Sequence, residues 1–253
     1  MPSRVCVFVD GENFRHTIGE LFETFDRKDY LPKGANWEEL FDWLVTQVED
    51  DGQRVRTYWY VVRHLDFNPY RFPRIDKQPD VLKRILCRDN DIREELKVLE
   101  GDDLASRMQE LVKELSGKRS TMEQRFKWWT SVQNIIAADH TAVEFRRAGA
   151  ITYNLFNENL GQEKAVDVKL ATDLLTLSNI YDVAVIVSGD QDYVPAVEVV
   201  KDRGKKVVNV AFETRGGKLL PGGARRLNHI TDASLKIPHA DLGAHLGLVD
   251  PQS

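Results

Sequence analysis

Acidic side chains follow two separate apolar runs of this sequence. Asp10 comes directly after residues 5–9 (VCVFV), and Asp190 and Asp192 come after residues 183–189 (VAVIVSG). An apolar run that ends in an acid is typical of a parallel strand, buried on both faces, whose carboxyl end opens into a ligand crevice. The sequence therefore predicts an acidic, cation-binding site at the ends of two strands.

Two further aspartates, Asp167 and Asp173, lie in a segment predicted to be helical. Residues six apart in a helix point about 240° apart around its axis. The two carboxylates therefore cannot share one face unless Asp167 lies in the turn before the helix. We expect one of them to bind metal while the other positions a neighbouring group. Lys164 and Lys169 are expected to neutralise this cluster or to reach a phosphate of the substrate.

Carboxylates held close together repel one another, so some of their pKa values should rise unless a cation compensates. Hard carboxylate oxygens suit Mg²⁺ or Mn²⁺ rather than Zn²⁺, and none of the six histidines lies in either strand-end motif. Such an ion would bind a phosphodiester oxygen and activate a water for in-line displacement. Asn13 would hold a carboxylate or phosphate oxygen without adding negative charge, and Ser188 stands at the second strand end. Each single Asp could instead simply cap the helix that follows it.

Strands and helices alternate along the chain, which predicts a layered α/β fold with a mostly parallel sheet. The expected strands span 4–9, 55–62, 150–155, 183–187 and 206–211, and the expected helices span 14–25, 36–48, 166–178 and 193–202. Asn36 is expected to cap the second of these helices, with Glu39 three residues later. The alternation stops at residue 63, after which helices are expected at 81–87, 92–115 and 122–145. Residues 1–62 and 150–235 are therefore assigned to one discontinuous domain, 63–149 to an α-helical insertion, and 236–253 to a C-terminal tail.

Three motifs together resemble the NYN family of PIN-like ribonucleases. They are residues 7–13 (VFVDGEN), 164–173 (KAVDVKLATD) and 188–195 (SGDQDYVP), in that order. The resemblance implies a PIN-like three-layer α/β/α sandwich and a Mg²⁺- or Mn²⁺-dependent endoribonuclease site. It also implies catalytic, metal-linked roles for Asp10, Asp167, Asp173, Asp190 and Asp192. The insertion departs from the compact pattern of the family.

A basic, glycine-rich loop at 215–226 follows the last expected strand of the domain. Arg215, Lys218, Arg225 and Arg226 could bind a nucleic-acid backbone through their charge, or the loop could be a flexible surface segment. Six aromatic residues could stack on unpaired bases, although aromatic residues at helical or strand spacing are more often core residues: Trp59, Tyr58, Tyr60, Phe126, Trp128 and Trp129.

Composition limits the remaining possibilities. The chain has 253 residues, 42% of them hydrophobic, and a net charge of −5, so it can bury a full core and carries no global positive field. Two cysteines cannot form a disulfide framework, and we see no leader and no apolar run near the roughly 20 residues that span a bilayer. We expect a soluble, cytoplasmic protein that acts on single-stranded or looped RNA.

Other functions fit part of this pattern. A non-cleaving RNA-binding or regulatory protein could use the same scaffold, because the insertion is large enough to block the crevice or to form a homodimer or protein-partner surface. A phosphatase or a DNA nuclease would also use acids and a metal. A phosphatase that forms a phospho-aspartate would need a second Asp two residues after Asp10, where this chain has Glu12.

Overall fold

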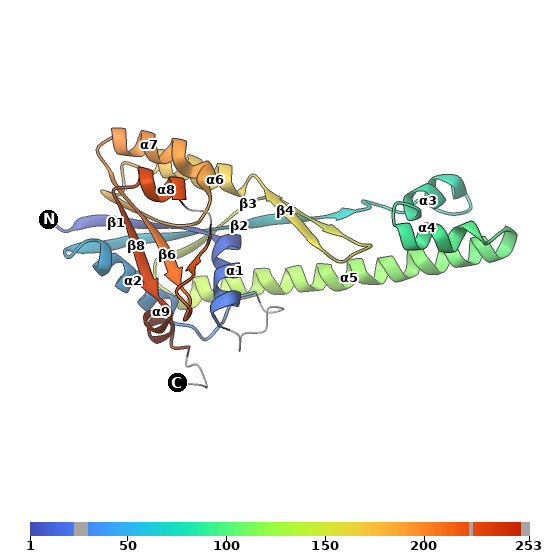
Figure 1. Ribbon diagram of the computed structural model, residues 1–253, viewed down its shortest axis with the longest axis horizontal. Coiled ribbons are helices and arrows are strands. Elements are labelled where there is room, and N and C mark those ends of the chain that lie inside the picture. The colour runs from blue at the N-terminus through green and yellow to red at the C-terminus, as the bar shows by residue number, and fades with distance from the viewer. Residues whose placement is uncertain (23–29, 223–224, 249–253) are drawn as a thin grey trace. The chain divides into compact units, whose positions relative to one another are not determined.

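The computed structural model describes residues 1–22, 30–222 and 225–248. The chain forms two compact units that alternate along the sequence. The first contains Met1–Arg63, Trp128–Ala148 and the chain from Ala165 onward, and the second contains His64–Lys127 and Gly149–Lys164. Three elements, β2, β3 and α5, contribute residues to both units (Figure 1).

The first unit is built on a mostly parallel sheet, as the sequence predicts. Its strands follow the order β3-β2-β1-β5-β6, and both β7 and β8 pair with β6. All pairs between β2, β1, β5, β6 and β8 are parallel, whereas β7 is antiparallel to β6. The bounds are β1 (Ser3–Asp10), β2 (Gly52–Asn68), β3 (Val143–Asn154), β5 (Val183–Val187), β6 (Lys206–Glu213), β7 (Leu219–Leu220) and β8 (Ala233–Pro238).

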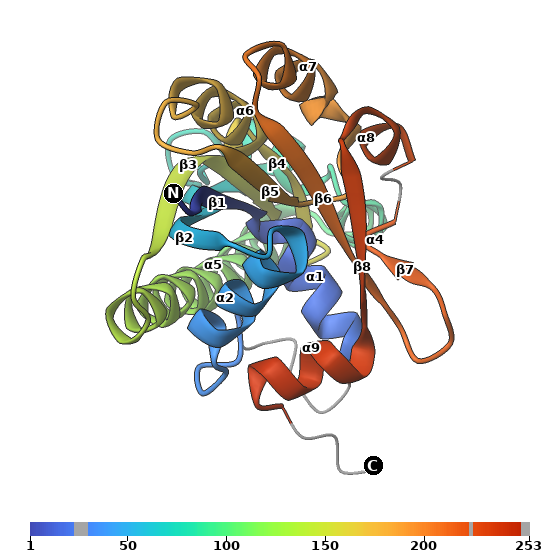
Figure 2. The same ribbon diagram turned by 90° about the vertical axis from the view of Figure 1, so that its left-hand side faces the viewer.

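Helices cover both faces of this sheet, which confirms the PIN-like three-layer α/β/α class. Figure 2 shows α6 (Val166–Thr176), α7 (Val194–Asp202) and α8 (Arg225–Ile230) on one side, with α1 (Gly11–Leu21), α2 (Trp37–Val48) and α9 (His239–Leu246) on the other. The predicted cap of α2 is confirmed, because the side chain of Asn36 accepts a hydrogen bond from the Glu39 amide. Residues 23–25 of the first expected helix lie outside the described residues.

The core of the first unit explains why the strand ends are rigid. Residues Val5–Val9 and most of β5 are fully buried, as their continuous apolar runs predict. Trp59 packs edge-on against Trp37 at 5.0 Å and Phe41 at 5.7 Å between ring centres. Each fully buried large apolar side chain stabilises the fold by roughly 1.5–3 kcal/mol. The two strands that end in acids therefore run through the buried core of the unit.

The second unit contains helices and a β-ribbon. Its helices are α3 (Pro79–Leu86), α4 (Asn90–Lys97) and the first part of α5 (Gly101–Asp139), and its ribbon pairs the end of β3 with β4 (Leu160–Lys164) in antiparallel fashion. The Arg119 guanidinium lies 4.5 Å from the Phe67 ring and donates to the Pro69 and Tyr70 carbonyls. In the described ranges, no helix combines the length and the apolar character needed to span a bilayer.

Three predicted element bounds between 63 and 149 are wrong. Strand β2 continues past residue 62 to Asn68, the two expected helices at 92–115 and 122–145 are replaced by α4 and one continuous α5, and residue 143 starts a strand. Gly117 does not break α5, because one glycine costs a helix only about 1 kcal/mol. The strand expected at 150–155 is part of β3, but residues 143–149 of β3 were missed because they are mostly half buried and lack the continuous apolar run of β1 and β5.

Candidate active site

The parallel pairing of β1 and β5 brings Asp10 next to Ser188. Val9 and Val187 are partners in the register, so the residues that follow them leave the sheet at the same edge. The Ser188 hydroxyl donates to Asp10 Oδ2 at 2.8 Å. Asp10 also caps α1, because it accepts from the Asn13 amide at 3.3 Å and from Asn13 Nδ2 at 2.5 Å. Gly11 is required here, since a Cβ would lie 2.2 Å from the Tyr60 carbonyl oxygen.

Tyr193 connects Asp10 to Asp167. Its hydroxyl lies 3.2 Å from Asp10 Oδ2 and 3.2 Å from Asp167 Oδ1. A phenol carries one proton, so it can donate to only one of the two carboxylates at a time. Burial raises the pKa of Tyr193 far above its usual value, and the charges of Asp10 and Asp167 raise it further. The hydroxyl is therefore a neutral donor that lies between the two acids and can donate to either of them.

Asp10 is a buried acid whose hydrogen-bond donors are all neutral. Its exposed fraction is 0%, and burial raises its pKa to about 6 against the stabilising hydrogen bonds from Ser188 and Asn13. The nearby charge of Asp167 raises the pKa further. Within the described part of the chain, no cationic side chain forms an ion pair with Asp10. Ionised Asp10 is therefore poorly compensated by the protein itself.

Asp190 and Asp192 lie in the turn after β5. The Asp190 side chain accepts from the Asp192 amide at 2.9 Å and so caps the short 3-10 helix η1 (Gln191–Tyr193). The charge of Asp190 also contributes to the raised pKa of Tyr193. Asp192 is exposed. Asp190 thus combines the capping role and the strand-end position that the sequence left open, whereas Asp192 supplies only the amide that Asp190 caps.

Asp173 has different partners. It is 3% exposed, and its carboxylate accepts from Lys169 Nζ at 2.6 Å, Arg146 Nη1 at 2.5 Å and the Tyr60 hydroxyl at 3.1 Å. Burial alone would raise the pKa of Asp173, but the hydrogen bonds from Lys169 and Arg146 outweigh it and the pKa lies below its usual value. Asp167 and Asp173, six residues apart on α6, therefore lie in two separate clusters.

The predicted phosphate-binding residues are spread over both units. A Cβ on Gly189 would lie 2.5 Å from the Gly222 carbonyl oxygen, so the basic loop approaches the turn that carries Asp190. Lys218 in this loop pairs with Glu20 at 3.3 Å. Arg215, Arg225 and Arg226 are exposed, and the last two begin α8; residues 223–224 lie outside the described residues. Lys164 ends β4 in the second unit.

Most of the aromatic residues considered for base stacking belong to the core. Trp59, Tyr58, Tyr60 and Trp129 are all buried. Trp128 differs, because it is 42% exposed and the Lys33 ammonium lies 3.5 Å from the centre of its ring.

Three residues of these clusters were missed by sequence reasoning. Tyr193 opens the helix after Asp192, and only its adjacency to the acidic turn could have indicated a role. Tyr60 was assigned to the core by its strand position, without its bond to Asp173. Arg146 lies in β3, in a segment that was read as the end of a helix and its following loop, so no motif pointed to it.

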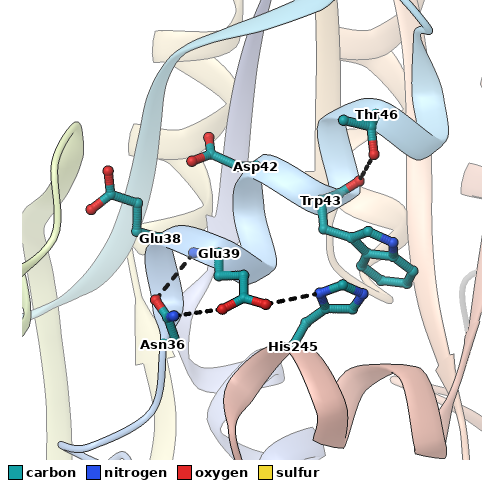
Figure 3. Close-up of a pocket in the computed structure, with 7 residues that line it drawn as sticks. All are labelled: Asn36, Glu38, Glu39, Asp42, Trp43, Thr46 and His245. Carbon is teal, nitrogen blue, oxygen red and sulfur yellow. Dashed lines mark hydrogen bonds and ion pairs between the residues drawn. The ribbon is translucent and has the colours of Figure 1, made fainter.

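A separate hollow of about 520 Å³ lies beside α2 and α9 (Figure 3). It contains none of the predicted site residues, and its carboxylates already have partners. Asp42 pairs with Arg54 at 2.6 Å, Glu39 faces His245 at 3.5 Å, and Glu38 accepts from the Thr141 amide. His245 also stacks on Trp43 at 4.1 Å between ring centres. These groups attach α9 to α2, and their negative charge would repel a phosphate.

The donors at the sheet edge suit a hard cation in chemistry. Asp10 and Asp167 offer carboxylate oxygens. The raised pKa of Asp10 shows that its ionised form is costly in this buried place, and a bound divalent ion would remove that cost. As positioned among the described residues, no group of three or more His, Cys, Asp or Glu side chains is close enough to form a metal centre. The fit therefore rests on the Asp10–Asp167 pair rather than on five converging acids.

Comparisons with known proteins support a family. The sequence model of the NYN domain matches residues 102–220, which include Asp167, Asp173, Asp190 and Asp192 but not Asp10. No curated protein matches the chain. A crystal structure of a Vibrio parahaemolyticus protein, described as a protein of unknown function, is similar over 93% of both chains, with 14% identity and a TM-score of 0.43.

Proposed function

Because residues 102–220 match the model of the NYN domain, we propose that the protein is a Mg²⁺- or Mn²⁺-dependent endoribonuclease that hydrolyses phosphodiester bonds in single-stranded or looped RNA. One observation carries the proposal: Asp10 is fully buried beside Asp167 with only neutral hydrogen-bond donors. Asp10 and Asp167 would hold the ion, and metal-linked roles for Asp190 and Asp192 stay predictions from the sequence. The protein would act in the cytoplasm.

The protein's own residues prepare this site. Asn13 and Ser188 fix the orientation of the Asp10 carboxylate, and the Tyr193 hydroxyl lies between Asp10 and Asp167. A bound Mg²⁺ or Mn²⁺ would supply Lewis-acid polarisation of the phosphate and an acidified water as nucleophile, without a covalent intermediate. Phosphates of the RNA would be bound by the basic side chains predicted from the sequence: Lys164, Lys169, Arg215, Lys218, Arg225 and Arg226.

The test compares cleavage of a single-stranded RNA in Mn²⁺ by the wild type, Asp10→Asn and Asp167→Asn. Asp202→Asn is the control, because Asp202 is exposed at the end of α7. We expect both site variants to lose at least about 10³-fold in rate, roughly 4 kcal/mol of transition-state stabilisation, with the fold intact by circular dichroism. Full cleavage by both site variants would overturn the proposal.

A non-cleaving RNA-binding protein is the second candidate. Two observations favour it. The described residues contain no group of three acids that could hold a metal, and the Asp173 carboxylate already pairs with Arg146 and Lys169. A gel shift with RNA but no cleavage in Mg²⁺, Mn²⁺ or Ca²⁺ would support it. A parallel panel of RNA, DNA and small phosphoesters would identify a DNA nuclease or a phosphatase. A homodimer or partner contact through residues 63–149 stays a prediction.

A further inference from the structure

The Asp173 carboxylate is already satisfied by side chains of the first unit. Oδ1 accepts from Lys169, and Oδ2 accepts from both Arg146 and Tyr60. A divalent ion at this carboxylate would lie next to two cationic groups in a place that is 3% exposed. Like charges at such short range repel strongly where water is scarce. The surroundings of Asp173 therefore oppose its use as a metal ligand.

The two cations of this cluster are not equivalent. The Arg146 side chain is 21% exposed, donates to both Asp173 and Glu144, and lies 4.1 Å from the Tyr58 ring centre. The Lys169 side chain is 42% exposed, and Asp173 is the acid with which it pairs among the described residues. An ammonium has three donors, and one of them points to Asp173. Lys169 can therefore bind an anion at the surface without leaving Asp173.

Tyr60 relates this cluster to the candidate active site. Tyr60 and Asp10 are register partners in the β1–β2 pairing, and the Tyr60 hydroxyl donates to Asp173. Lys169 lies one helical turn before Asp173, toward the end of α6 that carries Asp167. Lys169 and Asp167 are two residues apart on α6 and so do not share a face, which makes the Lys169 ammonium a separate site for a phosphate beside the Asp10–Asp167 pair.

We propose that Asp173 is a positioning residue rather than a metal ligand, and that it holds the Lys169 ammonium as a binding site for a backbone phosphate of the RNA. Arg146 compensates the remaining charge of the buried carboxylate. This inference rests on the proposed function, because it assumes that RNA lies across the Asp10–Asp167 pair.

The test uses the full chain and measures two properties other than cleavage. Mn²⁺ affinity is measured by electron paramagnetic resonance for the wild type, Asp173→Asn and Asp10→Asn. Affinity for a single-stranded RNA oligonucleotide is measured by fluorescence anisotropy in EDTA at several salt concentrations, for the wild type, Lys169→Gln and Lys169→Arg. Lys206→Gln is the matched control, because Lys206 has a 41% exposed side chain and pairs with Glu49 at the amino end of β6.

We expect Asp173→Asn to keep its Mn²⁺ affinity within twofold, whereas Asp10→Asn loses tenfold or more. Lys169→Gln should lower the slope of log affinity against log salt by about 0.7, the value for one phosphate contact of a single strand, and Lys169→Arg should restore it. Lys206→Gln should leave the slope unchanged.

Two results would overturn the inference. One is a tenfold loss of Mn²⁺ affinity in a folded Asp173→Asn, which would make Asp173 a ligand. The other is the same salt slope for Lys169→Gln and Lys206→Gln. If the wild type binds no Mn²⁺, the proposed metal-dependent function fails, and the salt slope of Lys169→Gln still decides the phosphate contact. If Asp173→Asn does not fold, the salt slope of Lys169→Gln still tests the phosphate contact. Lys169→Gln should fold, because the Lys169 side chain is partly exposed.

Discussion

Asp10 and Asp173 are both buried aspartates of the first unit. Tyr60 is the register partner of Asp10, and its hydroxyl donates to Asp173. Asp10 accepts hydrogen bonds from an amide, a serine and a tyrosine, and its pKa is raised to about 6. Asp173 accepts from a lysine and an arginine, and its pKa is lowered. Burial is common to both, so the charge of the donors decides whether each carboxylate is compensated. An uncompensated acid can attract a cation, whereas a compensated one stabilises its neighbours.

The largest difference between the two clusters should be seen on neutralising each acid. Asp173→Asn leaves Arg146 and Lys169 without their shared partner, and we expect it to lower the free energy of unfolding by roughly 2–4 kcal/mol, a range reduced for their partial exposure. Asp182→Asn is the control, because Asp182 also pairs with an arginine and a lysine but at the surface, and should cost no more than about 1 kcal/mol. Urea unfolding at pH 7 measures both. If Asp173→Asn and Asp182→Asn lowered the free energy of unfolding equally, the Asp173 cluster would contribute no more than a surface ion pair does.

The two acids should also respond to pH with opposite signs. The pKa of Asp10 is about 6 when folded and 3.8 in the reference state, so the native protein binds more protons between these values and stability falls as pH rises from 4 to 6. The loss amounts to roughly 2–3 kcal/mol in the absence of metal. The pKa of Asp173 is lowered, so its contribution is present above pH 4 and is lost as pH falls through its folded pKa.

Unfolding in EDTA at pH 4, 6 and 8 tests this contrast. Asp10→Asn should remove the decline between pH 4 and 6, so that the variant is more stable than the wild type at pH 8. Added Mn²⁺ should restore the stability of the wild type at pH 8 but not change that of the variant. A wild type equally stable at pH 4 and pH 8 in EDTA would contradict the uncompensated state of Asp10.

The smallest effect concerns the hydroxyl that joins Asp10 and Asp167. Tyr193→Phe removes one hydrogen bond and should lower the free energy of unfolding by about 1 kcal/mol. The loss should grow as pH rises through 6, because a hydrogen bond to an ionised acceptor is stronger than one to a neutral acceptor. Tyr181→Phe is the control, since the Tyr181 hydroxyl donates to the Leu174 carbonyl. A pH-independent loss in Tyr193→Phe would show that Asp10 does not titrate beside the Tyr193 hydroxyl.

The elements that sequence reasoning predicted best are those with a strong local signal. The strand at 183–187 has the predicted bounds, and the cap at Asn36 was found, because apolar runs and capping side chains act between near neighbours. The first half of β3 and the continuity of α5 were missed, since a half-buried strand and a helix through Gly117 have no local marker. At the site, the strand-end position of Asp10 could be read from the sequence, whereas the partner of each acid could not.

The sequence by itself determined the α/β class, the positions of the buried strands along the chain and the acids that follow those strands. It could do so because the period of apolar residues and the turn chemistry are local properties. Only the tertiary structure decided which acids meet. Tyr193 reaches Asp10 from 183 residues away along the chain, and Arg146 reaches Asp173 from β3. A carboxylate's charge state depends on burial and on the donors around it, and both are fixed by which distant segments pack together.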